Sequence, residues 1–244
     1  GGVAGGTVPT PHIDSIADDG VSFTNGYAAN GTCAPSRAAL MSGRYGTRFG
    51  FEFTPTPPGM MQIVGMLSGE NETRLRPALM YDDVETVSYE DMGMPPSEIT
   101  IAELLREQGY HTGHIGKWHL GMGWDFEVTS EFKPDEDRFN ARSYPGNPGV
   151  TEETRALWDA SFSKPTTGGP TTRGFDSYFG VDVPNWPPYC FIDNDRTVGI
   201  PSEYLPARLL GSNQASTPGP AMPYWHFEQL LPTWAEKADA YISE

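Results

Sequence analysis

The chain has 244 residues, and its 32 acidic and 16 basic side chains give a formal net charge of −16. No run of lysine or arginine builds a basic patch, so nucleic-acid binding by phosphate neutralisation is not expected, and no apolar run of these residues is long enough for a membrane span. Hydrophobic residues make up 37% of the chain, which is enough for a packed core and argues against a disordered protein.

The N-terminal part predicts a helix followed by a strand. Residues 10–20 form the helix, because Thr10 suits the N-cap, Pro11 suits the first helical position and Gly20 suits the end. Residues 21–28 are rich in β-branched and aromatic side chains, which favours a strand.

A cysteine and an arginine lie together at the start of the next predicted helix. Pro35 can open this helix, which covers residues 35–42 and ends at Gly43. Arg37 follows Cys33 by one helical turn, so both lie on the same face. Free backbone N–H groups at the helix start favour an anion beside the guanidinium. Two alternatives stay open: a small buried cysteine, or a thiolate nucleophile that needs a histidine base.

The middle of the chain predicts an α/β unit. Residues 44–96 are irregular and are expected to shape the rim of a pocket. A helix then begins at Thr100 with capping-box spacing to Glu103 and ends at Gly109, followed by a strand over residues 110–115. Binding sites in such units gather at the C-terminal ends of strands. The expected apolar stripe of the helix is formed by Ile101, Leu104 and Leu105.

A lysine and a histidine follow this strand. In an extended segment Lys117 and His119 point the same way, and Trp118 turns to the core. An ammonium group beside an imidazole suits a bound anion and a leaving group that must be protonated. The alternative is a surface lysine and a structural histidine.

The C-terminal half holds the candidate substrate residues. Residues 122–170 are a second irregular excursion with one helix at 151–159, residues 173–180 form a compact aromatic segment, and a last helix begins near 232. Residues 185–189 are expected to form a surface loop with exposed aromatics. Cys190 is expected to be a buried or semi-buried free thiol. The candidates for the rim of a substrate site are Asn185, Trp186, Asn194 and Arg196, and the alternative is a loop stiffened only by its prolines.

Two of these segments together resemble the signatures of the sulfatase family. Residues 33–37 with Gly43 and Arg44 match the first signature, and residues 109–119 match the second. Weaker similarity covers residues 10–28 and 173–196. The resemblance implies an α/β fold like that of the alkaline-phosphatase superfamily, with a mixed sheet flanked by helices. It also implies that residues 1–244 are part of one catalytic domain.

The resemblance further implies a function and a set of roles. In this family the cysteine, here Cys33, is converted by a formylglycine-generating enzyme to Cα-formylglycine, whose hydrated form attacks sulfur in a sulfate ester. Arg37 would hold the formylglycine, Lys117 would bind sulfate and His119 would assist proton transfer. A divalent cation, Ca²⁺ or Mg²⁺, would bind residue 33 as formylglycine. The expected substrate is a sulfated small molecule or carbohydrate, and the expected compartment is periplasmic, secreted or lysosomal.

The acidic pairs of the chain do not match the metal ligands of the family. Asp18 and Asp19 close a helix instead of following an apolar strand, and Asp82 and Asp83 lie in the first excursion. The remaining metal ligands are therefore expected outside the chain. Two competing functions stay open: a phosphonate or phosphodiester hydrolase of the same superfamily, and a catalytically incomplete fragment. No role is assigned to His12, His111 or His114, and His226 is expected to be structural.

Overall fold

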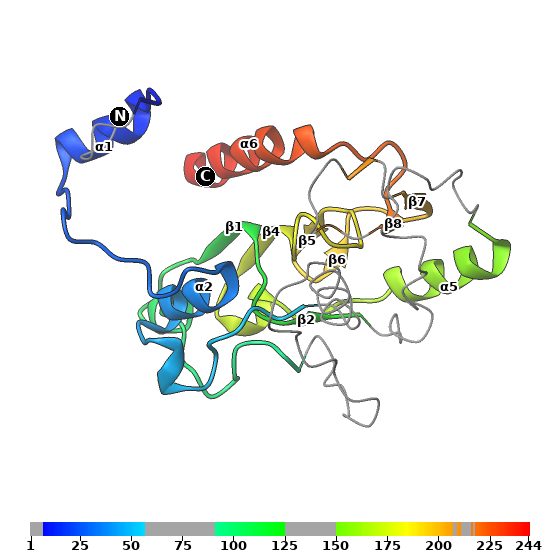
Figure 1. Ribbon diagram of the computed structural model, residues 1–244, viewed down its shortest axis with the longest axis horizontal. Coiled ribbons are helices and arrows are strands. Elements are labelled where there is room, and N and C mark those ends of the chain that lie inside the picture. The colour runs from blue at the N-terminus through cyan, green and yellow to red at the C-terminus, as the bar shows by residue number, and fades with distance from the viewer. Residues whose placement is uncertain (1–6, 57–90, 125–149, 207–208, 211–215, 217) are drawn as a thin grey trace, which may run out of the picture.

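The main sheet has four strands of mixed direction (Figure 1). The structure is a computed structural model that describes residues 7–56, 91–124, 150–206, 209–210, 216 and 218–244. Strand β1 (Gly113–Lys117) is parallel to β4 (Ser177–Val181). Strand β4 is antiparallel to β5 (Ile192–Asp193), which is antiparallel to β6 (Arg196–Thr197). The register sets Lys117 opposite Val181 at the C-terminal end of the parallel pair.

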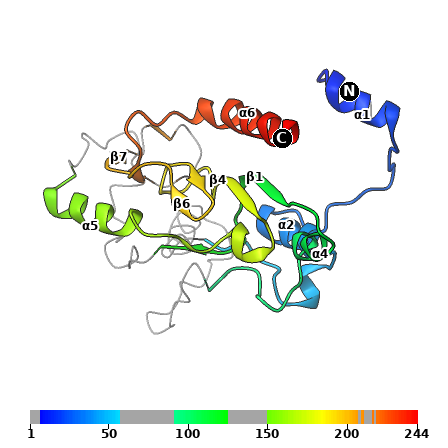
Figure 2. The ribbon, with the colours of Figure 1, turned by 180° about the vertical axis from the view of Figure 1, so that it is seen from behind.

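Helices cover both faces of the sheet (Figures 1 and 2). On one face, α2 (Cys33–Ser42) and α4 (Ile101–Glu107) share a core with Tyr178 of β4. On the other face, α6 (Leu230–Ser243) contacts β1 and β4, and its Lys237 lies 4.6 Å from the ring centre of Phe179. Because neighbouring residues of a strand point to opposite faces, Tyr178 and Phe179 serve the two layers. The predicted α/β class, with a mixed sheet flanked by helices, is confirmed.

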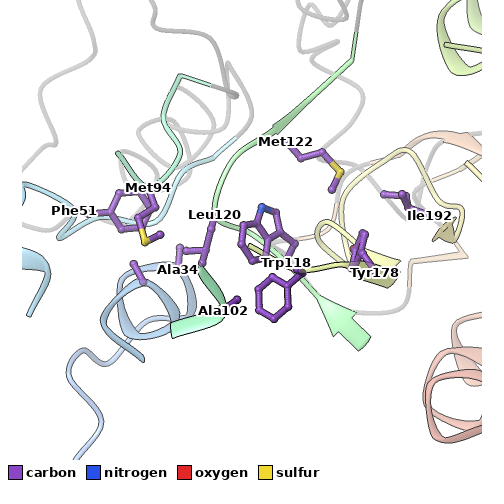
Figure 3. Close-up of a cluster of buried hydrophobic side chains, with 11 residues drawn as sticks. Ala34, Phe51, Met94, Ala102, Trp118, Leu120, Met122, Tyr178 and Ile192 are labelled. Carbon is purple, nitrogen blue, oxygen red and sulfur yellow. The ribbon is translucent and has the colours of Figure 1, made fainter. Parts of the chain in front are cut away.

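Trp118 lies at the centre of the larger core (Figure 3). Its ring is fully buried, and its indole N–H donates to the carbonyl of Gly121 at 2.9 Å. The expectation that Trp118 turns to the core is therefore confirmed. The core around it is formed by Ala34, Ala38, Phe51, Met94, Ala102, Leu120, Met122, Phe175, Tyr178 and Ile192.

The remaining elements are short apart from two helices. Helix α5 (Glu152–Phe162) agrees with the helix predicted over 151–159. Helix α1 (Pro11–Asp19) agrees with the first predicted helix, and it buries no side chain. Within the described ranges, no helix combines the length and apolar character needed to cross a membrane. The others are η1 (Gly46–Arg48), β2 (Met122–Gly123) paired with β3 (Thr167–Gly168), η3 (Pro170–Arg173), β7 (Glu203–Leu205) paired with β8 (Gly219–Ala221), and η5 (Phe227–Gln229).

The predictions that rest on local signals agree with the structure. Helix α2 ends at Gly43, whose φ of 67° is left-handed as a glycine end requires. The capping box of α4 is present, with Thr100 accepting from Glu103 N–H and the Glu103 carboxylate accepting from Thr100 N–H. The last helix begins at Leu230, close to the predicted start.

Three predictions about strands and faces are wrong. Residues 21–28 form no strand, and Val21, Phe23 and Tyr27 are 76%, 83% and 88% exposed, because no neighbouring strand pairs with them. The strand predicted over 110–115 begins only at Gly113, since the N–H of Tyr110 still bonds to the carbonyl of Leu105 in the turn that ends α4. The buried residue of α4 is Ala102, whereas the predicted stripe of Ile101, Leu104 and Leu105 is largely exposed.

A small residue is needed at Gly180, in the middle of β4. A Cβ there would collide with the carbonyl of Gly116 on β1 and approach the Tyr178 ring at 2.9 Å. We expect Gly180→Ala to lower the free energy of unfolding by about 1–3 kcal/mol, because the parallel pair must separate to accept the methyl group. Gly31→Ala, where a Cβ meets nothing within 4 Å, is the matched control. Equal urea midpoints for the two variants would contradict the prediction.

Candidate functional site

The two signature segments meet at the C-terminal end of β1. Cys33 begins α2, and its Sγ lies 3.4 Å from Nδ1 of His119, which follows β1. Cys33 is exposed, whereas His119 is 1% exposed. The other ring nitrogen of His119, Nε2, lies 3.0 Å from the carbonyl oxygen of Pro55 and donates to it. The ring of Trp186 packs in a T-shaped arrangement against the imidazole, with 5.0 Å between ring centres.

Arg37 holds α2 against the end of β1. Its Nε donates to the carbonyl of Trp118 at 2.9 Å, and its Nη2 donates to the carbonyl of Lys117. Burial lowers the pKa of Arg37, and the nearby Cys33, Tyr178 and Asp182 oppose this shift, so the guanidinium stays charged. The prediction that Arg37 lies on the same face as Cys33 is consistent with this arrangement.

His119 is neutral at physiological pH. Burial is the main cause that lowers its pKa to about 4, and the positive charges of Lys117 and Arg37 act in the same direction. The hydrogen bond to the Pro55 carbonyl opposes the shift only in part. Because Nε2 carries the donated proton, Nδ1 presents a lone pair to residue 33. The site therefore combines a proton acceptor with two cationic groups.

A carboxylate at the end of β4 holds the backbone of the histidine. The N–H of His119 donates to Oδ1 of Asp182 at 3.0 Å, and the N–H of Trp118 lies 3.0 Å from the carbonyl of Val181. Sequence reasoning missed both Asp182 and Pro55. The available signal for Asp182 was its position directly after a strand, where sites gather; Pro55 acts through its carbonyl, which no side-chain pattern reveals.

His114, which received no role, also bonds within this segment. Its Nε2 lies 3.1 Å from the carbonyl of Lys117, the same oxygen that accepts from Arg37. Its ring packs among aromatic side chains, and burial lowers its pKa. The Lys117 peptide is therefore held from two directions. The aromatic neighbours of His114 are Trp118, Phe175 and Tyr178.

The loop over residues 185–189 is not the exposed loop that was predicted. Trp186 and Tyr189 are buried, because Trp186 packs on His119 and Tyr189 belongs to the second core cluster. The Tyr189 hydroxyl donates to the carbonyl of Asn185 at 2.9 Å. Of the four candidate rim residues, the structure thus brings Trp186 into contact with the site and places Asn185 one residue before it.

The other two rim candidates bond elsewhere. The side-chain oxygen of Asn194 accepts from the N–H of Tyr178 at 3.0 Å, and Arg196 donates to the carbonyl of Ser163 at 3.0 Å. These contacts hold the β5–β6 turn against β4 and the end of α5. A substrate role for Asn194 and Arg196 stays a prediction.

The described residues do not assemble a calcium site by themselves. Within the described ranges, no group of three or more histidine, cysteine, aspartate or glutamate side chains gathers in a way that could hold a metal ion. Asp18 and Asp19 are exposed at the end of α1, and Asp82 and Asp83 lie outside the described residues. The residues present therefore do not fit a complete shell of the six to eight oxygen ligands that calcium prefers.

The remaining singled-out residues are placed away from this chemistry. Cys190 is a buried free thiol, as expected, and burial raises its pKa. His111 bonds to the Tyr241 hydroxyl of α6 at 3.0 Å, which joins this helix to β1. His12 and His226 are exposed.

The mixed sheet with helices on both faces defines an α/β protein, and the segments that hold Cys33, Arg37, Lys117 and His119 meet at the ends of its strands. A family model described as Sulfatase matches residues 1–191. The chain belongs to the sulfatase family.

Three curated relatives agree with this assignment. Arylsulfatase G of Mus musculus is 35% identical over 227 residues, which cover 87% of this chain and 34% of the relative. Steryl-sulfatase of Rattus norvegicus is 37% identical over 142 residues, 58% of this chain and 20% of the relative. N-acetylgalactosamine-6-O-sulfatase of Bacteroides thetaiotaomicron is 35% identical over 116 residues, 48% of this chain and 16% of the relative. The chain thus spans about a third or less of the length of these relatives.

The low pKa of His119 predicts a loss of stability in acid. An unfolded histidine takes up its proton near pH 6.5, whereas His119 in the folded chain does so only near pH 4. Between these values the unfolded state binds more protons, so stability falls as the pH falls. For the unmatured protein we expect His119 to account for a loss of roughly 2–3 kcal/mol between pH 7 and pH 4.5.

Urea unfolding at the two pH values measures this contribution. In His119→Gln the same change of pH should cost less, whereas His12→Gln, at an exposed histidine, should behave as the wild type. An equal acid loss in wild type and His119→Gln would contradict the assignment.

Proposed function

We propose that the protein hydrolyses sulfate esters, with residue 33 as the nucleophile after conversion of Cys33 to Cα-formylglycine. The observation that carries this proposal is the 3.4 Å approach of Cys33 Sγ to Nδ1 of His119, with Arg37 fixed one helical turn away. The sulfur stands in for the oxygen that the matured residue would carry. A hydroxyl at this place can give its proton to a neutral imidazole.

Each side chain of the site has a role that follows from its charge. When present, formylglycine supplies a hydrated aldehyde whose hydroxyl is nucleophilic towards sulfur. The Nδ1 atom of His119 accepts a proton from the group at position 33. The positive charge of Arg37 acts on the group at position 33 and that of Lys117 acts on the neighbouring His119, and both charges are proposed to stabilise a bound sulfate. In a chain with a net charge of −16, such local cations are what makes anion binding possible.

The family also implies a divalent cation, Ca²⁺ or Mg²⁺, bound by residue 33 as formylglycine. Because the described residues do not complete its shell, the roles above are assigned only to the side chains of this chain. Residues 1–244 are proposed to be one part of the catalytic domain, and a formylglycine-generating enzyme is the proposed partner in maturation. A periplasmic, secreted or lysosomal location would suit this family.

The proposed substrate is a sulfated small molecule or a sulfated carbohydrate. The names of the relatives cover both kinds, since one is a steryl-sulfatase and another an N-acetylgalactosamine-6-O-sulfatase. Trp186, which contacts His119, offers an apolar ring at the site. Asn185, Asn194 and Arg196 are the proposed polar contacts of the rim.

Maturation of Cys33 is the first test. The full-length protein is produced together with a formylglycine-generating enzyme, and its tryptic peptide ending at Arg37 is analysed by mass spectrometry. We expect an aldehyde in place of the thiol at position 33, and an unchanged thiol at the buried Cys190. Hydrolysis by a protein whose Cys33 is entirely unmodified would contradict the proposed nucleophile.

Arg37→Lys tests the cationic part of the site. Lysine keeps the charge, but its single ammonium group lacks the planar pair of N–H donors with which Arg37 reaches the Trp118 and Lys117 carbonyls. We expect kcat/KM for an aryl sulfate, normalised to the aldehyde content, to fall by about 10²-fold or more. Arg48→Lys, in η1, is the control and should keep full activity.

Paired aryl sulfate and aryl phosphodiester substrates distinguish the two reactions of the superfamily. We expect the larger kcat/KM for the sulfate. A larger kcat/KM for the phosphodiester would overturn the proposed substrate class.

In the separate test of Arg37, full activity of Arg37→Lys would remove the role of Arg37.

A further inference from the structure

We infer that Asp182 is a positioning residue for His119, and that its carboxylate holds the turn that aims the imidazole at residue 33. The catalytic effect expected of Asp182 rests on the proposed function, whereas the contacts of Asp182 do not. Asp182 lies directly after β4, opposite the point where the chain leaves β1. It was not singled out from the sequence.

The backbone beyond β1 is pinned to the end of β4. The ladder ends at the pair Lys117 and Val181, and the next N–H, from Trp118, lies 3.0 Å from the Val181 carbonyl and 3.2 Å from the Asp182 carbonyl. The following N–H, from His119, points to Oδ1 of Asp182 at 3.0 Å. The side chain of Asp182 thus replaces the next backbone acceptor of the ladder.

This hydrogen bond stabilises a conformation that His119 does not adopt readily. Its φ is 60°, in the left-handed region that side chains with a Cβ disfavour. The turn lets Trp118 enter the core while the imidazole of His119 returns towards α2, which two successive extended residues could not do. A carboxylate that accepts the N–H of His119 offsets the cost of this turn.

The ring and the backbone of His119 are held by different groups. The Pro55 carbonyl accepts from Nε2 and Trp186 packs in a T-shaped arrangement against the imidazole, but both contacts act on the ring. Asp182 is the partner that the structure shows for the N–H of His119. The charge of Asp182 also acts on Arg37, where it opposes the lowering of the pKa by burial. The effect of the hydrogen bond to His119 and the effect of the Asp182 charge must therefore be separated by experiment.

Substitutions at Asp182 can separate these two effects. Asp182→Asn keeps an oxygen acceptor and removes the charge, whereas Asp182→Ala removes both. The difference between the two variants therefore reports the hydrogen bond to His119. Asp182→Glu keeps the charge but moves the acceptor by one methylene, and it serves in place of Asp182→Ala if that variant does not fold. Asp239→Ala, at an exposed aspartate of α6, is the control.

Hydrolysis of an aryl sulfate by the matured full-length enzyme is the first readout. We expect kcat of Asp182→Ala to be about tenfold or more below that of Asp182→Asn, because the proton acceptor is misplaced. KM should differ between the two by less than about threefold, since Arg37 and Lys117 remain to bind the anion. Equal kcat values, or a loss confined to KM, would overturn the inference.

Alkylation of Cys33 in the unmatured protein is the second readout and needs no sulfatase activity. Iodoacetamide reacts with the exposed sulfur of Cys33, which lies 3.4 Å from Nδ1 of His119, so the rate of reaction reports whether the imidazole is in place. At pH 7.5 we expect Cys33 of Asp182→Ala to react about tenfold more slowly than Cys33 of Asp182→Asn, while the buried Cys190 stays unmodified in each. Equal rates at Cys33 would overturn the inference.

The two readouts separate this inference from the proposed function. A difference in alkylation without hydrolysis of any sulfate ester supports the role of Asp182 and removes the proposed function. Hydrolysis that is equal in Asp182→Asn and Asp182→Ala supports the function and removes the role of Asp182.

Discussion

The site depends on the two hydrogen bonds that join Arg37 to the peptide carbonyls of Lys117 and Trp118. They connect the first turn of α2 to the end of β1, two elements that are about 80 residues apart in the sequence. A guanidinium group suits this junction, because its planar fork can donate to two neighbouring carbonyls at once. Trp118 is buried against Ala34 and Ala38 of α2 and fills the inside of this junction. The junction brings residue 33 to the turn that holds His119.

The charges of the site are balanced locally, within a chain that is strongly acidic. His119 is neutral, because burial and the positive charges of Lys117 and Arg37 all lower its pKa. A neutral imidazole can take a proton from residue 33, which an imidazolium cannot do. The carboxylate of Asp182 opposes the loss of charge on Arg37. In the proposed function, the same few residues attract the anion and accept the proton.

The parts that the sequence predicted correctly are those with local causes. The capping box of Thr100, the glycine that ends α2 and the burial of Trp118 follow from neighbouring residues alone. The segment 21–28 was predicted wrongly because a strand exists only when another strand pairs with it. Burial of Trp186 also depends on a distant contact, with His119. The convergence of the two signatures was anticipated through a family resemblance, whereas the place of Asp182 beside the N–H of His119 follows from the register of the sheet.

The register of β1 against β4 is fixed by a pair of glycines, so the position of the site residues depends on how the two strands pair. Gly116 and Gly180 are register partners, and the space above Gly180 is filled by the Gly116 carbonyl, which leaves no room for a side chain. A slip of one residue would bring a side chain into this contact and turn every residue of β1 to the opposite face. Because Lys117 is the next residue after Gly116, the tight pair also sets where β1 ends. The carboxylate that follows β4 then accepts the N–H of His119, which makes the geometry of the histidine a consequence of strand pairing.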